Sequence, residues 1–287
     1  MAQMIISGIA LGAAYGLVAL GIVLVHKATG ILNFAHGEMV MVTTFVALSL
    51  VGFGVPYWLA VVLTLIFASV FGFSVQTALM RKLIGAPLMS SALVCLGLFL
   101  ILGDVAVWIW GKDPHMFPSP FTERPFEFGG VILSMADLGP IVVCGILSVG
   151  LFLFFRLTKV GVAMQATMDN QTAARLMGIP IKKMFSYSWM LATMVAAIAG
   201  LLIAPVTFLH FTFMQSILHF AFAAAVLGGI NSLHGAMIGG VILGVVTNLV
   251  GFYVSSGLKE AMPFLIMLLI LILKPQGLFS TEAEKKV

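Results

Sequence analysis

Long apolar stretches follow one another along the whole chain, and short polar stretches separate them. A helix needs about 20 mostly apolar residues to cross the hydrocarbon core of a bilayer. The pattern therefore predicts an all-α, polytopic transmembrane protein with eight to ten membrane segments. The candidate segments are residues 4–25, 34–52, 56–79, 88–110, 138–155, 185–209, 215–230, 235–253 and 261–273. Because the seventh and ninth are short, we expect that either could be tilted, broken or re-entrant.

The composition supports a membrane protein and limits the number of domains. Of the 287 residues, 61% are apolar and only 8% are charged, whereas a soluble domain carries about 25% charged residues. So much apolar surface cannot be hidden in a core of this size and must face lipid. The polar stretches are too short to form an ATPase or a solute-binding domain, so residues 1–287 are predicted to form a single transmembrane domain.

Lysine and arginine residues concentrate in the loops after the third and fifth segments and in the C-terminal tail. Basic loops of membrane proteins lie on the cytoplasmic side. Residues 157–183 are therefore expected to form a cytoplasmic loop and residues 275–287 a cytoplasmic tail, while residues 111–130 lie outside. With nine crossings, the N-terminus lies outside and the C-terminus inside.

A stripe of small residues, Gly8, Gly12 and Gly16, runs along one face of the first segment. Small residues at this spacing allow membrane helices to approach closely. The simpler interpretation is packing within one bundle, and the alternative is packing against a second membrane subunit. A second glycine-rich stretch near the C-terminus, from Gly235 to Gly244, allows the same two interpretations.

The most unusual stretch is Asn-Phe-Ala-His-Gly-Glu at positions 33–38, where the second apolar segment begins. A charged group in the membrane interior costs about 2.5–3.5 kcal/mol on insertion scales, so such groups usually face protein or water. One interpretation is that His36 and Glu38 cap the cytoplasmic start of the helix, with Glu38 near the positive end of its dipole. The other is that these residues line the inner end of a translocation path. A metal site is not expected, because residues two apart do not share a helix face.

Asp104 is the only carboxylate that the sequence places clearly inside the membrane. It is either a hydrogen-bonded structural group or a polar group in the transport pathway. A proton-coupled carrier would use such a residue as its relay, but no second buried carboxylate or lysine accompanies it. An ion-coupled secondary carrier acting alone is therefore the alternative function.

Motifs of catalysis and nucleotide binding are missing from the sequence. It contains no GxSxG, no HExxH and no GxxxxGK[ST] phosphate loop. We therefore expect that the protein is not an enzyme and binds no cofactor itself. If ATP drives it, another chain must hydrolyse the ATP.

The loop after the fifth segment contains a short stretch with helix-forming composition, residues 165–177. Gly178 and Pro180 follow it, and glycine followed by proline is a helix stop signal. A short amphipathic helix on the cytoplasmic face suits docking into a groove of a partner protein. A helix lying on the membrane surface is the alternative, but it would need Trp or Phe anchors that this stretch lacks.

Several motifs resemble those of one family. The sequence TAARLMG at 172–178 resembles the EAAxxxG coupling loop of bacterial ABC-importer permeases, with Thr172 in place of the usual Glu. Residues 8–41, with the stretch at 33–38, resemble the opening of branched-chain amino acid (Liv-type) ABC permeases. Residues 221–244 resemble their glycine-rich signature, and LILKPQGLF at 271–279 resembles their usual ending. The resemblance covers essentially the whole chain.

The resemblance implies a permease subunit of an ATP-driven importer in the bacterial inner membrane. Its cargo would be branched-chain or other hydrophobic amino acids, or related solutes such as urea, amides or aromatic acids. The subunit would form half of the translocation path and couple to a separate ATPase through residues 165–180. The implied partners are a second homologous permease subunit, two cytoplasmic ABC ATPases, a periplasmic substrate-binding protein and the lipid bilayer, but no nucleic acid.

The resemblance also assigns residues to three groups. The ATPase-coupling residues would be Thr172, Ala173, Ala174, Arg175 and Gly178. The signature turn would contain Asn33, His36, Gly37 and Glu38. The late glycine-rich segment would contain Gly228, Gly229, Gly235 and Gly239.

Overall fold

The computed structural model describes residues 1–121, 126–128 and 131–279. Parts of the predicted external segment (122–125 and 129–130) and of the predicted tail (280–287) lie outside the described residues. The helices are α1 (Ala2–Thr29), α2 (His36–Gly52), α3 (Tyr57–Ala78), the 3-10 helix η1 (Met80–Leu83), α4 (Leu88–Trp110), α5 (Met135–Leu157), α6 (Lys159–Asp169), α7 (Gln171–Leu176), α8 (Ile181–Thr207), α9 (Phe213–Gly228), α10 (Leu233–Tyr253) and α11 (Ser256–Leu273).

The predicted helical membrane architecture is confirmed. Seven helices in the described residues are long and apolar enough to cross a membrane, and α2 and α9 are shorter apolar helices. Two differences appear. The ninth segment begins at Ser256 rather than 261 and has 18 residues, because Ser255 caps it and the charged Lys259 and Glu260 lie in its early turns. Strands β1 (Phe126–Phe128) and β2 (Val131–Leu133) also form a small antiparallel hairpin between α4 and α5.

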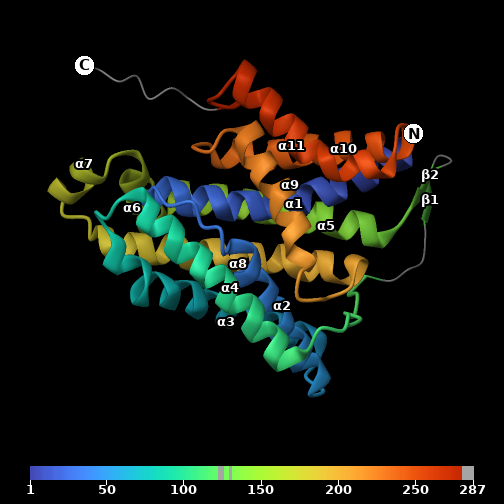
Figure 1. Cartoon of the computed structure of the whole chain (residues 1–287), viewed down its shortest axis with the longest axis horizontal. Coiled ribbons are helices and arrows are strands. Elements are labelled where there is room, and N and C mark those ends of the chain that lie inside the picture. The colour runs from blue at the N-terminus through green and yellow to red at the C-terminus, as the bar shows by residue number, and fades with distance from the viewer. Residues whose placement is uncertain (122–125, 129–130, 280–287) are drawn as a thin grey trace.

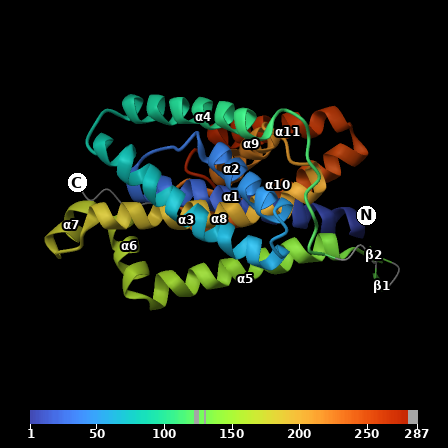
Figure 2. The ribbon, with the colours of Figure 1, turned by 90° about the horizontal axis from the view of Figure 1, so that it is seen from below.

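The helices surround α1, which runs through the middle of the bundle (Figure 1). It packs against α5, α8, α9 and α10 and is almost wholly buried. A helix that is apolar all round suits this position, because no face has to meet water. Few residues of helices α4, α5 and α11 are buried. Figure 2 shows α4 and α5 on opposite sides of the bundle, with α11 on the side of α4.

The glycine stripe of α1 lies against α10 of the same chain. A Cβ atom built on Gly12 would be 2.6 Å from the carbonyl oxygen of Gly240, and one on Gly8 would be 2.8 Å from Cα of Val245. The two helices therefore meet backbone to backbone. This geometry matches packing within one bundle and leaves the α1 stripe no free face for a second subunit.

The turn between α9 and α10 is equally tight. Gly229 ends α9 at a φ of 104°, where a residue with a side chain would be strained. A Cβ atom on Gly239 would lie 2.9 Å from the backbone nitrogen of Gly228. The C-terminal segment closes this turn, because the N–H of Leu278 donates to the Leu227 carbonyl at 2.8 Å. It thereby satisfies a carbonyl that the helix end would leave unpaired.

Candidate functional site

The first candidate region is the turn that leads into α2. Gly30 ends α1 in the left-handed conformation, and its N–H donates to the His26 carbonyl at 2.7 Å. Asn33 is fully buried, and its Oδ1 accepts a hydrogen bond from the N–H of Ala35 at 3.1 Å. Such a side-chain turn redirects the backbone. The chain therefore turns back into the bundle before α2 begins.

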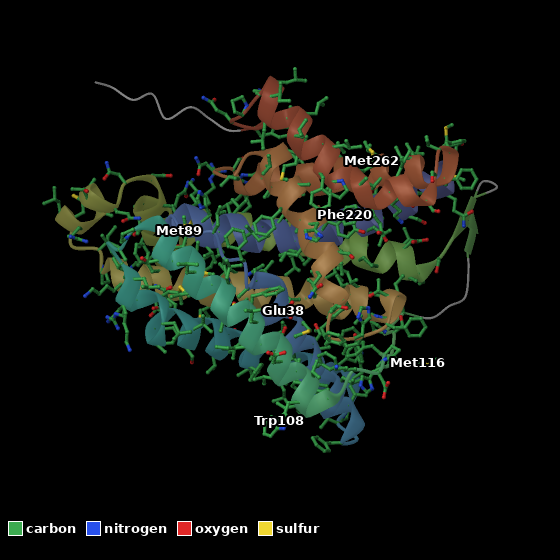
Figure 3. All side chains as sticks on the ribbon, viewed as in Figure 1. Glu38, Met89, Trp108, Met116, Phe220 and Met262 are labelled. Carbon is green, nitrogen blue, oxygen red and sulfur yellow. The ribbon has the colours of Figure 1, made fainter. Side chains whose placement is uncertain are left out.

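His36 and Glu38 consequently lie inside the bundle rather than at its surface. The His36 ring packs on α1 so closely that a Cβ atom at Gly21, eight residues before the end of that helix, would lie 2.5 Å from His36 Nε2. Figure 3 shows Glu38 near the middle of the bundle, far from α7 at its end. The interpretation as surface caps is wrong, because no side chain caps the start of α2. Glu38 does lie in the first helical turn, near the positive end of the dipole.

Three helices surround the Glu38 carboxyl group. The side chain of Gln215 on α9 lies close to this carboxyl group. On α4, a Cβ atom at Gly103 would lie 3.9 Å from Glu38 Oε2. Gly37 faces Leu218 of α9, with 3.3 Å from a built Cβ atom to Leu218 Cδ2. The signature turn therefore forms a polar centre where α2, α4 and α9 meet.

The polar centre lowers the stability of the bundle, because it buries polar atoms that have no partner. Within the described residues, both ring nitrogens of His36 and Oε2 of Glu38 are buried without a hydrogen-bond partner. A buried polar group without a partner costs about 1–3 kcal/mol, and more when charged. Such groups in a membrane protein mark functional sites. No group of three His, Cys, Asp or Glu side chains suited to a metal ion occurs in the part of the chain that the structure describes.

Asp104 lies on α4, next to the residue that faces Glu38, but its own side chain is exposed. Apolar side chains that are also exposed surround it along the helix, including Leu100, Ile101 and Trp108. A carboxylate on a membrane-spanning helix should face protein or water rather than lipid. The α4 face around Asp104 is thus unsuited to contact with lipid alone.

The second candidate region consists of α6 and α7. The sequence predicted one helix over 165–177, but α6 ends at Asp169 and α7 begins at Gln171. The break occurs at Asn170, whose Oδ1 accepts a hydrogen bond from the N–H of Ala173 at 2.9 Å. Asparagine side chains favour such N-caps over a helix interior. Gly178 follows α7 at a φ of 80°, at the stop that the sequence predicted.

Two contacts tie this region to the central helix. Lys27 of α1 forms an ion pair with Asp169 at 3.1 Å, and Nε2 of Gln171 donates to the Ala28 carbonyl at 3.1 Å. Both partners belong to the last turn of α1. These contacts join the end of α6 and the start of α7 to the last turn of the helix that runs through the bundle.

The outer surface of α7 is exposed and partly apolar. Of the predicted coupling residues, Ala174 is buried, whereas the side chains of Thr172, Ala173 and Arg175 are exposed. The sequence analysis included Leu176 and Met177 in the coupling loop at 172–178 but did not single them out, and their side chains are 84% and 82% exposed. The available signal was an apolar pair directly before the glycine stop. In Figure 1, α7 projects from the end of the bundle opposite the N-terminus and the β1–β2 hairpin.

Comparison with known families decides the assignment. Residues 4–271 match the family model described as branched-chain amino acid transport system / permease component. The chain belongs to this permease family. The match covers the signature turn, α7 and the glycine-rich turn, so all three regions lie in the part that is shared with the family.

Curated relatives resemble the permease over nearly its whole length. The high-affinity branched-chain amino acid transport system permease protein LivH of Salmonella typhimurium is 30% identical over 99% of this chain and 97% of its own. The permease protein BraD of Pseudomonas aeruginosa, named for the same kind of transport system, is 28% identical over the same shares. The ribose import permease protein RbsC of Escherichia coli is 26% identical over 81% of this chain and 73% of its own.

Proposed function

We propose that this permease forms half of the translocation path of an ATP-driven importer and couples to a separate ATPase through residues 165–180. The observation that carries the proposal is the pair Leu176 and Met177, exposed at the end of α7. A short helix with exposed apolar anchors suits a hydrophobic groove in a partner. The contacts of Asp169 and Gln171 with α1 give the docked helix a mechanical link to the bundle.

The distribution of basic residues supports a cytoplasmic position for α7. Nine of the eleven described Lys and Arg residues lie in α6, α7 and η1 or at the adjoining ends of α1, α5, α8 and α11. Lys112 and Lys259 lie in segments toward the other end. Because basic residues gather on the cytoplasmic side, the end that carries α7 faces the cytoplasm and the β1–β2 hairpin lies outside.

A second, homologous permease subunit would cover the face formed by α4 and α11. Few residues of either helix are buried, and α4 carries Asp104 on its exposed surface. A neighbouring subunit or an aqueous path between the two subunits would keep this carboxylate away from lipid. Glu38 and Gln215 lie just behind α4, so this face places the polar centre beside the proposed path.

The remaining components of the importer are separate chains. Two cytoplasmic ABC ATPases would bind and hydrolyse ATP, because the sequence has no phosphate loop of its own. A periplasmic binding protein would deliver the solute. The permease itself would perform no catalysis and bind no cofactor, and it would reside in the bacterial inner membrane.

The proposed cargo is a branched-chain or similarly hydrophobic amino acid. The names of LivH and BraD support this choice, and both relatives cover nearly the whole chain, whereas RbsC covers less of it. Urea, amides and aromatic acids are related candidates. We favour import over ion-coupled transport by the single chain, because LivH and BraD, which match nearly the whole chain, are named as permease proteins of transport systems.

The experiment that tests this cargo is the ATPase activity of the complex reconstituted with each candidate binding protein. We expect leucine, isoleucine or valine, together with the matching binding protein, to raise the rate of ATP hydrolysis. Ribose, tested with its own candidate binding protein, is the control and should leave the rate at its basal value. Stimulation by ribose and not by any hydrophobic amino acid would overturn the assignment.

A further inference from the structure

A cavity of about 940 Å³ lies between α1, α5 and α10. Its lining includes Ile9, Ile141 and Val241 toward the outer end and Lys27, Arg156 and His234 toward the end that carries α7. Lys27 lies 18 positions after Ile9 on α1, which corresponds to about 27 Å along the helix axis. The cavity is therefore a long groove, and its length is close to the thickness of the hydrocarbon core of a bilayer, about 30 Å.

The groove is on the opposite side of the bundle from the proposed path. Figure 2 shows α5 away from α4 and α11. Few residues of helix α5 are buried, and it packs mainly along α1 and against α6. The groove therefore opens between α5 and α10 on a side where lipid, rather than the second permease, is the expected neighbour.

The charge in the groove is concentrated at one end. No Asp or Glu in the part of the chain that the structure describes lines it. Arg156 has no ion-pair partner among the described residues, and its guanidinium lies 5.7 Å from the centre of the Phe152 ring. The Phe152 ring in turn contacts the His234 ring, with 5.8 Å between the ring centres. Lys27 reaches the same end, although it also pairs with Asp169.

Gln165, Asn231 and Ser232 also line the groove. The stretch along α1 and α5 is otherwise mostly apolar and contains small residues, and the hydroxyl of Ser148 within it donates to the Cys144 carbonyl at 2.7 Å. Ala13 and Leu20 of α1 form its floor, and Gly145 of α5 contributes no side chain. A Cβ atom at Gly145 would meet nothing within 4 Å. A long, mostly apolar groove with a cationic end at the membrane surface is complementary in shape and charge to an anionic phospholipid.

We propose that the α1–α5–α10 groove binds one anionic phospholipid from the leaflet on the side of α7. Arg156, with Lys27 beside it, binds the phosphate group, and an acyl chain lies along Ala13, Gly145 and Val241. The bound lipid fills the space between α5 and α10, and so supports the helix that leads into α6 and α7. The site depends on the shape of this chain and not on which solute the importer carries.

Native mass spectrometry of the purified full-length permease, exchanged into phosphatidylglycerol or phosphatidylcholine, tests the site. We expect one tightly retained phosphatidylglycerol molecule, with an affinity about tenfold higher than that of phosphatidylcholine. A difference of this size corresponds to one charge-assisted contact. Arg156→Gln should remove this preference. Gly145→Leu should reduce the retention of both lipids, because its side chain would fill the groove.

Gly150→Leu is the matched control. Gly150 lies on the same helix, a Cβ atom there also meets nothing within 4 Å, and the residue does not line the groove. This variant should retain lipid as the wild type does. Equal retention of the two lipids by the wild type, or unchanged retention in Gly145→Leu, would overturn the proposal. So would photocrosslinking from position 145 that captures a protein subunit instead of lipid.

Discussion

Replacing Gly240 with leucine is expected to remove most of the folded permease from the membrane. A Cβ atom at Gly240 would lie 2.5 Å from the backbone nitrogen of Gly16 and 2.7 Å from the carbonyl oxygen of Gly12. Both obstacles are backbone atoms of α1, so no side-chain rotation relieves the clash. Overpacking in a core costs about 1–3 kcal/mol of stability when neighbouring side chains can move aside. Here the backbones of α1 and α10 would have to separate, so we expect a larger loss of stability.

This loss would be measured as the amount of monodisperse permease extracted from membranes in a mild detergent, compared at equal synthesis. Gly150→Leu is the control, since it adds the same side chain to an exposed helix position with open space around it. The control should be recovered like the wild type. Equal recovery of Gly240→Leu would mean that the close approach of α1 and α10 does not hold the bundle together.

The double substitution Leu176→Asp and Met177→Asp is expected to abolish transport without reducing the amount of permease. Both side chains are more than four-fifths exposed and contribute almost nothing to the bundle. Burying an apolar side chain of this size in a partner's groove is worth about 1.5–3 kcal/mol. Losing two such contacts should lower the affinity for the ATPase by about 100-fold or more.

Co-purification of the ATPase with the tagged permease measures this effect, and solute uptake by cells gives its consequence. Met116→Asp provides the control, because Met116 is 81% exposed and lies at the end of the bundle away from α7 (Figure 3). The control should keep both the ATPase and uptake. Normal co-purification of the ATPase with the double variant would show that α7 is not the docking helix.

The membrane segments were predictable because the apolar length needed to span a bilayer is fixed. All nine stretches became helices, and even the short seventh one remained short as α9. The pattern could not show that α1 is central, since a uniformly apolar helix suits either lipid or the interior of a bundle. The glycine spacing showed that α1 packs closely against something, but only the structure identified α10 as its neighbour.

Local side-chain chemistry produced the main differences from the sequence predictions. Gly30 and Asn33 turn the chain inward, which places His36 and Glu38 inside the bundle and not as caps of the helix start. Asn170 capped a new helix and split the stretch expected to be continuous. Both effects depend on which of several possible hydrogen bonds the side chain makes. The groove beside α5 was not predictable either, because it depends on how far two helices that are distant in sequence stand apart.

The central claim is that this permease moves its solute only with ATP and partner subunits. The most direct measurement is uptake of radiolabelled leucine into proteoliposomes, with the binding protein outside and ATP enclosed with the ATPases. We expect uptake by the complete complex, little change with Asp104→Asn, and none by the permease alone under a proton or sodium gradient. Gradient-driven uptake by the single chain, lost in Asp104→Asn, would contradict the account and establish a secondary carrier.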